Sequence, residues 1–441
     1  MARKLFGTDG VRGSAGEFLT AELALALARA AVELSEEPRP QVLVVRDTRE
    51  SGDMLEAAVA AGITAAGGDA LLGGVLPTPA APLLVRRHGL ALAAVISASH
   101  NPYQDNGIKF FAADGFKLSD AAELEIERRA GEGPRPSTRI GRVLRHAHAE
   151  EDYLSELERR YGTLELTGMR LLLDCANGAT HRLAPAILER RGALVELMAA
   201  DPDGRNINAG VGATHIDALA ARMRSGAYDA GFAFDGDGDR VLAVDRRGEV
   251  VDGDELIAIS ALHYQRLGLL DGGGVAVTVM SNYGFHAAMR DAGIDVAVTP
   301  VGDRYVNEEL RRRGWRLGGE QSGHIIDLGF SPSGDGIASA LLTLEALGGA
   351  DLAERGAMHK LPQRLVNLRA EDRAGLARAL AADPVEHAVA QASAKLSGRG
   401  RVLVRASGTE PLVRVMVEAP SEQEAETVCD ELCRAVEAEL D

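Results

Sequence analysis

Three aspartates stand within five positions of a loop that separates two apolar, strand-like runs. Residues 235–240 read DGDGDR between GFAF and VLAVD, and the two glycines let the backbone turn between the carboxylates. So much negative charge in one tight loop is costly unless a cation neutralises it, and hard oxygen ligands suit Mg²⁺. Asp235, Asp237 and Asp239 therefore predict a divalent-metal site; the alternative is a solvated acidic turn. A calcium EF-hand is not indicated, because arginines occupy the sixth and twelfth positions, where that loop needs glycine and glutamate.

A second loop carries a candidate nucleophile. Residues 96–111 read ISASHNPYQDNGIKFF, where an apolar run ends in Ser97, Ser99 and His100. A serine exposed at the end of a strand can be a nucleophile if something activates or pre-charges it. The segment lacks the Gly-x-Ser-x-Gly sequence of the nucleophile elbow, so a serine hydrolase with a catalytic triad is not indicated. Lys109 could return to the loop as a cation or a general acid or base; the alternative is an ordinary strand–turn–strand with a surface lysine.

A third loop, GGEQSGHII at residues 318–326, places several polar groups within seven positions. Glu320 and Ser322 are the best candidates to bind vicinal sugar hydroxyls. His324 could orient a neighbour or stand near a proton in transfer, and the alternative is a satisfied core histidine.

A fourth segment, RASGTEPLVR at residues 405–414, has the composition of a phosphate nest. Arg405 and Arg414 supply guanidinium groups that can each donate two hydrogen bonds to a phosphate. The loop between them supplies hydroxyls and backbone N–H groups from Ser407, Gly408 and Thr409. Two further segments add single arginines, Arg12 together with Thr8 in FGTDGVRG and Arg304 in VGDRYVNEE. Either arginine could instead form a surface salt bridge, which contributes little.

Composition excludes several classes of protein. The 441 residues carry a net charge of −17, which argues against a nucleic-acid binder. Neither Gly-Lys-Ser/Thr nor Gly-x-Gly-x-x-Gly occurs, which removes the P-loop and the dinucleotide fingerprint. The three cysteines fit a reducing cytoplasm, and neither a secretion signal nor a membrane-spanning run is evident, so we expect a cytoplasmic protein without a membrane partner.

The elements that position these loops form a weak internal repeat. A helix is expected at 19–34, and buried strands that end in polar turns are expected at 41–52, 170–178 and 274–282. We therefore predict an α/β fold with three similar α/β units, followed by a smaller α+β domain of about 75 residues that contains a hairpin at 401–419. A capping box at Ser421 and Glu424 starts its last helix.

Together the four loops favour a phosphosugar mutase. A kinase needs a nucleotide site, and a simple phosphatase does not need a separate phosphate nest and a sugar-reading loop. A mutase must hold one phosphate while it reacts at another position, and so needs all four.

The segments SASHNP, DGDGDR, GGEQSGH and RASGTEP resemble, in order, the four signature loops of the α-D-phosphohexomutase superfamily. FGTDGVRG and GEQSGH most resemble the subgroup of bacterial phosphoglucosamine mutases, and DTRESG, DCANGA and GDGI support that resemblance. The resemblance implies four domains around a central cleft. We place these domains at residues 1–147, 148–250, 251–364 and 365–441.

The resemblance also implies roles for residues. It implies a phosphorylated Ser99, metal ligation by Ser99 and the three aspartates, and catalytic assistance from Lys109 and Arg12. It implies contact between the substrate and Glu320, Ser322, Arg405, Ser407, Gly408, Thr409 and Arg414. From the residues themselves we add His324 to the catalytic candidates and Arg240 and Arg304 to the candidates for substrate contact. Residues 208–215 read NAGVGATH, where a cysteine and a serine are more usual, and this segment is expected to lie away from the four loops.

The implied cofactors are Mg²⁺ and a hexose 1,6-bisphosphate activator, and a homodimer is possible. The implied reaction interconverts glucosamine 6-phosphate and glucosamine 1-phosphate for UDP-N-acetylglucosamine synthesis. The alternatives are a phosphomannomutase/phosphoglucomutase and a non-catalytic regulator that binds sugar phosphates.

Overall fold

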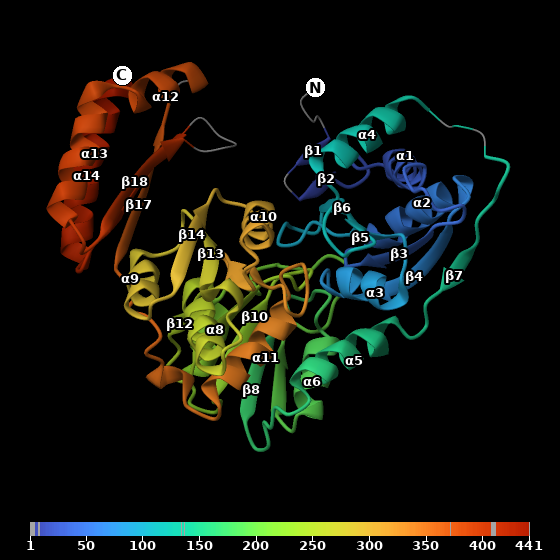
Figure 1. The fold of residues 1–441 in the computed structure, drawn as a ribbon, viewed down its shortest axis with the longest axis horizontal. Helices are drawn as coiled ribbons and strands as arrows, with labels where there is room; N and C mark the ends of the chain where they lie inside the picture. The colour runs from blue at the N-terminus through green and yellow to red at the C-terminus, as the bar shows by residue number, and fades with distance from the viewer. Residues whose placement is uncertain are drawn as a thin grey trace. The chain divides into compact units, whose positions relative to one another are not determined.

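The computed structural model describes residues 5–7, 9–133, 135, 137–370, 372–406 and 412–440. The chain forms two compact units, Met1–Met280 with Ile294–Arg355 and Ser281–Gly293 with Gly356–Asp441 (Figure 1). The first unit holds three sheets and the second holds a fourth. Among the described residues, none of the helices combines the length and the apolar character that crossing a membrane requires.

The first sheet has seven strands in the order β1-β2-β6-β5-β3-β4-β7, of which β3, β4, β5 and β7 are parallel. Its elements are β1 Phe6–Gly7, β2 Gly10–Ser14, α1 Ala21–Val32, β3 Gln41–Arg46, α2 Gly52–Ala65, β4 Asp69–Val75, α3 Ala80–His88, β5 Leu92–Ile96, β6 Asp105–Ala112, α4 Asp120–Gly131 and β7 Val143–Arg145. Val42 and Val44 on β3 pack into the core under α1, α2 and α4, so the alternate residues Leu43 and Val45 point to the face that α3 covers. Thr20 caps the start of α1, because its Oγ1 accepts a hydrogen bond from the Leu23 N–H at 3.2 Å.

The second and third sheets follow the same plan with fewer strands, in the orders β12-β11-β10-β8-β9 and β14-β13-β15-β16. The segment of the chain that forms the second sheet contains, in order, α5 Ala149–Tyr161, β8 Arg170–Asp174, α6 Leu183–Arg190, β9 Leu194–Met198, α7 Asp217–Met223, β10 Ala230–Phe234, β11 Val241–Asp245 and β12 Val250–Val251. The segments that form the third sheet contain, in order, α8 Gly253–Leu267, η1 Asp271–Gly273, β13 Gly274–Thr278, β14 Asp295–Thr299, α10 Asp303–Arg313, β15 Leu317–Gly319, β16 Ile325–Asp327, α11 Gly336–Leu347 and η2 Leu352–Glu354.

The three-fold repeat is confirmed by β3, β8 and β13, which begin at the predicted positions and each pair in parallel with two neighbours. Each sheet then adds an antiparallel strand directly after a parallel one: β6 after β5, β11 after β10, and β16 after β15. The three candidate loops of this unit are the connections inside these three strand pairs. A shared topology therefore puts each loop at the same place in its own sheet.

The smaller unit is an antiparallel sheet, ordered β17-β19-β18, with helices packed on it. Its elements are α9 Tyr283–Asp291, β17 Gln363–Arg369, α12 Arg373–Leu380, α13 Asp383–Leu396, β18 Arg401–Ala406, β19 Leu412–Glu418 and α14 Glu422–Leu440. The predicted strand pair within 401–419 is confirmed. Half of the predicted capping box is present, since the Glu424 N–H donates to Ser421 Oγ at 3.2 Å. Cys429 and Cys433 are buried in the core of this unit.

Candidate active site

Ser99 lies in the β5–β6 loop and points at the aspartate loop. Its side chain is buried, and its Oγ donates to Asp235 Oδ2 at 2.6 Å. The residue adopts φ 52°, a left-handed conformation that a non-glycine residue holds only where its surroundings impose it. Part of that support is a relay in which the Ser99 N–H donates to Ser97 Oγ at 2.9 Å, and Ser97 donates to Asp47 at 2.6 Å.

The fully buried Arg49 holds the same loop from the opposite side. Its guanidinium pairs with Asp47 at 2.9 Å and donates to the carbonyl oxygens of Ser99 and Asn101, each at 2.9 Å, and to two further carbonyls of the loop. Asn208 adds donation from Nδ2 to the same two carbonyls at 2.9 and 3.1 Å. The expectation that the segment 208–215 lies away from the four loops is therefore wrong, because its first residue contacts the Ser99 loop across the sheets.

Asp235, Asp237 and Asp239 are buried, and each offers a carboxylate oxygen within 4.8 Å of the others. Burial, then the charges of the other two aspartates, raises the pKa of Asp235 well above its ordinary value. Thr78 donates to Asp237 Oδ2 at 2.6 Å, whereas Asp237 Oδ1 and Asp239 Oδ1 have no hydrogen-bond partner among the described residues. Buried carboxylate oxygens without donors are costly, and three hard oxygen ligands fit Mg²⁺. The residues present therefore fit a bound divalent cation.

Two cationic side chains lie against this triad. Lys109 is buried, and its Nζ lies 2.8 Å from Asp237 and 3.7 Å from Asp239. His324 lies 3.6 Å from Asp239 and 3.7 Å from Asp303. Burial alone lowers the pKa of an imidazole, but the neighbouring Asp239 and Asp303 outweigh it and raise the pKa of His324. His324 is therefore biased toward the protonated form beside the carboxylates.

The charges of two arginines act on His100, the residue after Ser99. Burial, then the charges of Arg240 and Arg12, lowers the pKa of His100 to about 4, and its Nδ1 lies 3.4 Å from Ser99 Oγ. The Nε atoms of both arginines are buried and lack a hydrogen-bond partner in the described part of the structure. Buried guanidinium N–H groups without an acceptor suit an anion such as a phosphoryl group.

The third loop orients Glu320 toward the same region. Glu320 Oε1 accepts from the Gly302 N–H at 3.0 Å, and its charge acts on both Arg240 and His324. Ser322 is exposed at the tip of this loop. Arg304 is held elsewhere, in ion pairs with Asp120 and Glu123 at the start of α4.

In the smaller unit, Arg405 and Arg414 stand opposite each other on β18 and β19. Partial burial and then the charge of Arg414 lower the pKa of Arg405, which indicates that the two like charges are close. Arg414 Nε is buried and lacks a described hydrogen-bond partner. Ser407, Gly408 and Thr409, and Thr8 in the first segment, lie outside the described residues.

Several residues of the site were not predicted from the sequence. Asp47 and Arg49 could have been found, since they follow β3 in the same kind of polar turn as the other loops. Thr78 and Asn208 had none. Asp9 was also missed, and it lies 3.1 Å from Lys109 and pairs with Arg12 and Lys117.

Comparison with known proteins gives matches along nearly the whole chain. The four domain models of phosphoglucomutase/phosphomannomutase match residues 3–135 (α/β/α domain I), 151–248 (domain II), 252–364 (domain III) and 365–435 (C-terminal domain). The chain is 52% identical to phosphoglucosamine mutase of Moorella thermoacetica over 435 residues, covering 96% of this chain and 97% of that one. It is 47% identical to the phosphoglucosamine mutase of Deinococcus radiodurans, covering 99% and 98%.

Solved structures agree on the fold. A phosphoglucomutase/phosphomannomutase family protein from Burkholderia thailandensis superimposes with a TM-score of 0.81 at 24% identity, covering 98% of this chain and 97% of that one. The N-acetylphosphoglucosamine mutase of Aspergillus fumigatus, solved with GlcNAc-6P and magnesium, gives 0.70 at 18% identity, covering 99% and 96%. The predicted resemblance and the fold class of three α/β domains plus a C-terminal domain are thereby confirmed. The chain belongs to the phosphoglucomutase/phosphomannomutase family.

Proposed function

We propose that this protein interconverts glucosamine 6-phosphate and glucosamine 1-phosphate, using a phosphoryl group carried on Ser99. The observation that carries the proposal is the 2.6 Å contact between Ser99 Oγ and the buried aspartate triad, which brings a nucleophile to a candidate metal site. The relatives named phosphoglucosamine mutase, at about half identity over the full length, support the choice of sugar.

The reaction runs as two phosphoryl transfers. In the first, the free hydroxyl oxygen of the phosphosugar attacks the phosphorus on Ser99; the bond from phosphorus to Oγ breaks, and the sugar becomes a bisphosphate. After the sugar turns end for end, Ser99 Oγ attacks its other phosphorus and recovers a phosphoryl group. Each attacking hydroxyl loses a proton and each departing oxygen gains one, so the cycle is balanced. A hexose 1,6-bisphosphate supplies the first phosphoryl group to an unphosphorylated enzyme.

The side chains around Ser99 divide the remaining work. Asp235, Asp237 and Asp239, with the oxygen on Ser99, would hold Mg²⁺, which when bound would draw charge from the transferring phosphoryl group. We assign Lys109 and His324 to proton transfer and charge balance, because both lie against the triad. We assign Arg12 to stabilising the charge of the phosphoryl group, because its charge acts on His100 next to Ser99.

Recognition of the rest of the substrate falls to the other loops. We propose that Glu320 and Ser322 bind sugar hydroxyls and that Arg240 and Arg304 contact the sugar phosphate; for Arg304 this requires release from Asp120 and Glu123. Arg405 and Arg414, with Ser407, Gly408 and Thr409, would bind the non-reacting phosphate. We place the enzyme in the cytoplasm, at the step that leads to UDP-N-acetylglucosamine, and we propose a homodimer.

A panel of substrates tests the choice of sugar. The purified protein, Mg²⁺ and a trace of hexose 1,6-bisphosphate are followed by ³¹P NMR with glucosamine 6-phosphate, glucose 1-phosphate or mannose 1-phosphate. We expect the glucosamine ester to isomerise fastest. Faster turnover of glucose or mannose esters would favour a phosphoglucomutase or phosphomannomutase. No isomerisation by a protein that carries phosphate on Ser99 would favour the sugar-phosphate-binding regulator.

A further inference from the structure

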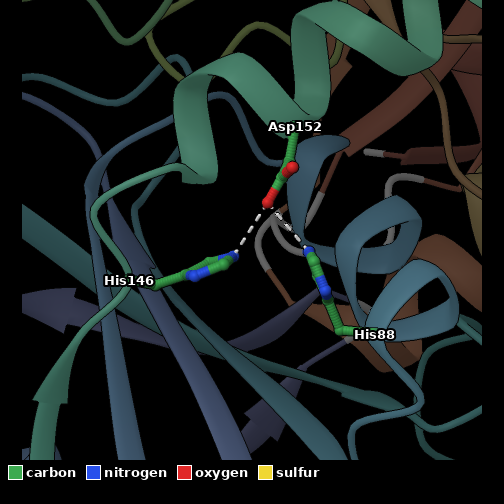
Figure 2. Close-up of side chains that lie close together, drawn as sticks. All are labelled: His88, His146 and Asp152. Atoms are coloured by element: carbon green, nitrogen blue, oxygen red, sulfur yellow. Dashed lines mark hydrogen bonds and ion pairs between the residues drawn. The ribbon is translucent and has the colours of Figure 1, made fainter.

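Two imidazoles and a carboxylate meet in the first unit, apart from the aspartate triad. His88 is the last residue of α3, His146 follows β7, and Asp152 lies in the first turn of α5. All three side chains converge on one point, and both rings direct Nε2 at the same carboxylate oxygen (Figure 2). None of the three has a part in the proposed reaction.

The distances within this histidine–aspartate cluster are those of a metal site whose ligands need little movement. Asp152 Oδ2 lies 2.9 Å from His88 Nε2 and 3.3 Å from His146 Nε2, and all three ligand atoms are within 4.8 Å of one another. Zinc bonds of roughly 2.0–2.2 Å in a tetrahedron put neighbouring ligand atoms about 3.3–3.5 Å apart. A cation at the meeting point would therefore be reached by small rotations of the side chains.

The polar groups of the cluster leave its ligand atoms facing one another. Among the described residues, His146 Nε2 is buried and makes no full hydrogen bond, but it lies 3.3 Å from Asp152 Oδ2. Arg87 lies 3.4 Å from the other oxygen, Asp152 Oδ1, and leaves Oδ2 to face the rings. The charge of Arg87 opposes a cation, so binding weaker than at a four-ligand structural zinc site is expected.

We propose that His88, His146 and Asp152 bind one borderline divalent transition metal such as Zn²⁺, with water completing the coordination. Nitrogen ligands select this class of metal over Mg²⁺, which prefers oxygen. The metal would fasten α3 of the first sheet to α5 at the start of the second. This inference does not rest on the proposed reaction.

The test is Zn²⁺ binding by equilibrium dialysis of the full chain in excess Mg²⁺, which occupies the aspartate triad. We expect one bound Zn²⁺ in the wild type, and a loss of affinity of roughly tenfold or more in His88→Ala and in His146→Ala. His387→Ala, which removes an exposed imidazole from α13, is the matched control and should bind Zn²⁺ as the wild type does.

Thermal unfolding provides the second measurement. Zn²⁺ should raise the Tm of the wild type and of His387→Ala but not that of His88→Ala, whose Tm without metal should match the wild type because the ring is at the surface. Absence of Zn²⁺ binding in excess Mg²⁺, or binding that both cluster variants retain, would overturn the proposal and leave the cluster as a histidine–aspartate ion pair.

Discussion

The aspartate triad and the histidine–aspartate cluster are built in opposite ways. The triad takes its three ligands from one loop, is fully buried and offers only oxygen. The cluster takes its ligands from three separate elements, is partly exposed and offers two nitrogens and one oxygen. The first arrangement fits a hard cation beside a reacting phosphoryl group, and the second fits a borderline metal that joins two segments. The difference predicts that each site can be damaged without affecting the other.

Among the variants at and around the aspartate triad, Ser99→Ala should give the largest effect on turnover. Removal of the phosphoryl acceptor should reduce turnover on the order of 10³-fold or more. The fold should persist, since Ser99 Oγ contributes few contacts and the loop is held by Arg49 and Asn208. Steady-state kinetics and circular dichroism check both points, and activity near the wild-type level would refute the assignment of the nucleophile.

Asp237→Asn removes one charged ligand from the triad. The loss of several kcal/mol of charge stabilisation corresponds to roughly 10²–10³-fold in rate. The Mg²⁺ concentration that gives half-maximal activity should rise at the same time. Zn²⁺ binding at the histidine–aspartate cluster should stay at the wild-type level in the same variant. An unaltered Mg²⁺ titration would remove Asp237 from the metal site.

Arg414→Ala tests anion binding by a site that contains no metal ligand. Loss of a charge-assisted hydrogen bond of about 1.5–3 kcal/mol should raise KM for the phosphosugar roughly 10- to 100-fold. The rate at saturating substrate should change much less. Arg399→Ala, which removes an exposed arginine that pairs with Glu424 in the same unit, is the control. An unchanged KM would exclude Arg414 from phosphate recognition.

Asp335→Asn alters the dependence of stability on pH. Burial raises the pKa of Asp335 from 3.8 to about 6, although the Ala338 N–H and the Tyr153 hydroxyl favour its charged form. A folded pKa above the unfolded one means that the stabilising contribution is complete below about pH 3.8 and is lost as the pH rises through 6, a change on the order of 3 kcal/mol. Asn can still accept at the helix cap, so the variant should be free of this loss.

Urea unfolding of both proteins between pH 4 and pH 8 measures the effect. The free energy of unfolding of Asp335→Asn, relative to the wild type, should increase with pH across this window. A difference between the two proteins that does not change with pH would show that Asp335 titrates alike in the folded and unfolded chains.

His88→Ala should give the smallest effect on catalysis. Because independent sites behave additively, its kcat, KM and Mg²⁺ dependence should stay within about twofold of the wild type. A large fall in activity would show that the two metal-ligating groups are coupled, and the contrast between them would fail.

How much the sequence could predict follows from the same contrast. The aspartates, the Ser99 loop and the Glu320 loop are each short segments after a strand, so local pattern was enough to find them. The repeat of β3, β8 and β13 was visible for the same reason, because buried strands and polar turns recur along the chain.

Contacts made across the fold could not be found in this way. Arg49 reaches four carbonyls about 50 positions away, Asn208 reaches the Ser99 loop from another sheet, and Thr78 meets Asp237 only after folding. The two histidines of the histidine–aspartate cluster likewise show no pattern in the sequence, because they meet Asp152 only when α3, β7 and α5 come together. The ion pairs of Arg304 with Asp120 and Glu123 are of the same kind, because local pattern does not connect residues so far apart in the chain.

The phosphorylation state of Ser99 during turnover tests the phosphoserine mechanism most directly. The enzyme is charged with hexose 1,6-bisphosphate and Mg²⁺, separated from free sugar, and analysed by intact mass and peptide mapping before and after addition of glucosamine 6-phosphate. We expect one phosphoryl group on Ser99, which passes to the sugar to give a bisphosphate. Isomerisation of the sugar by a protein whose Ser99 never carries phosphate would contradict the phosphoserine mechanism.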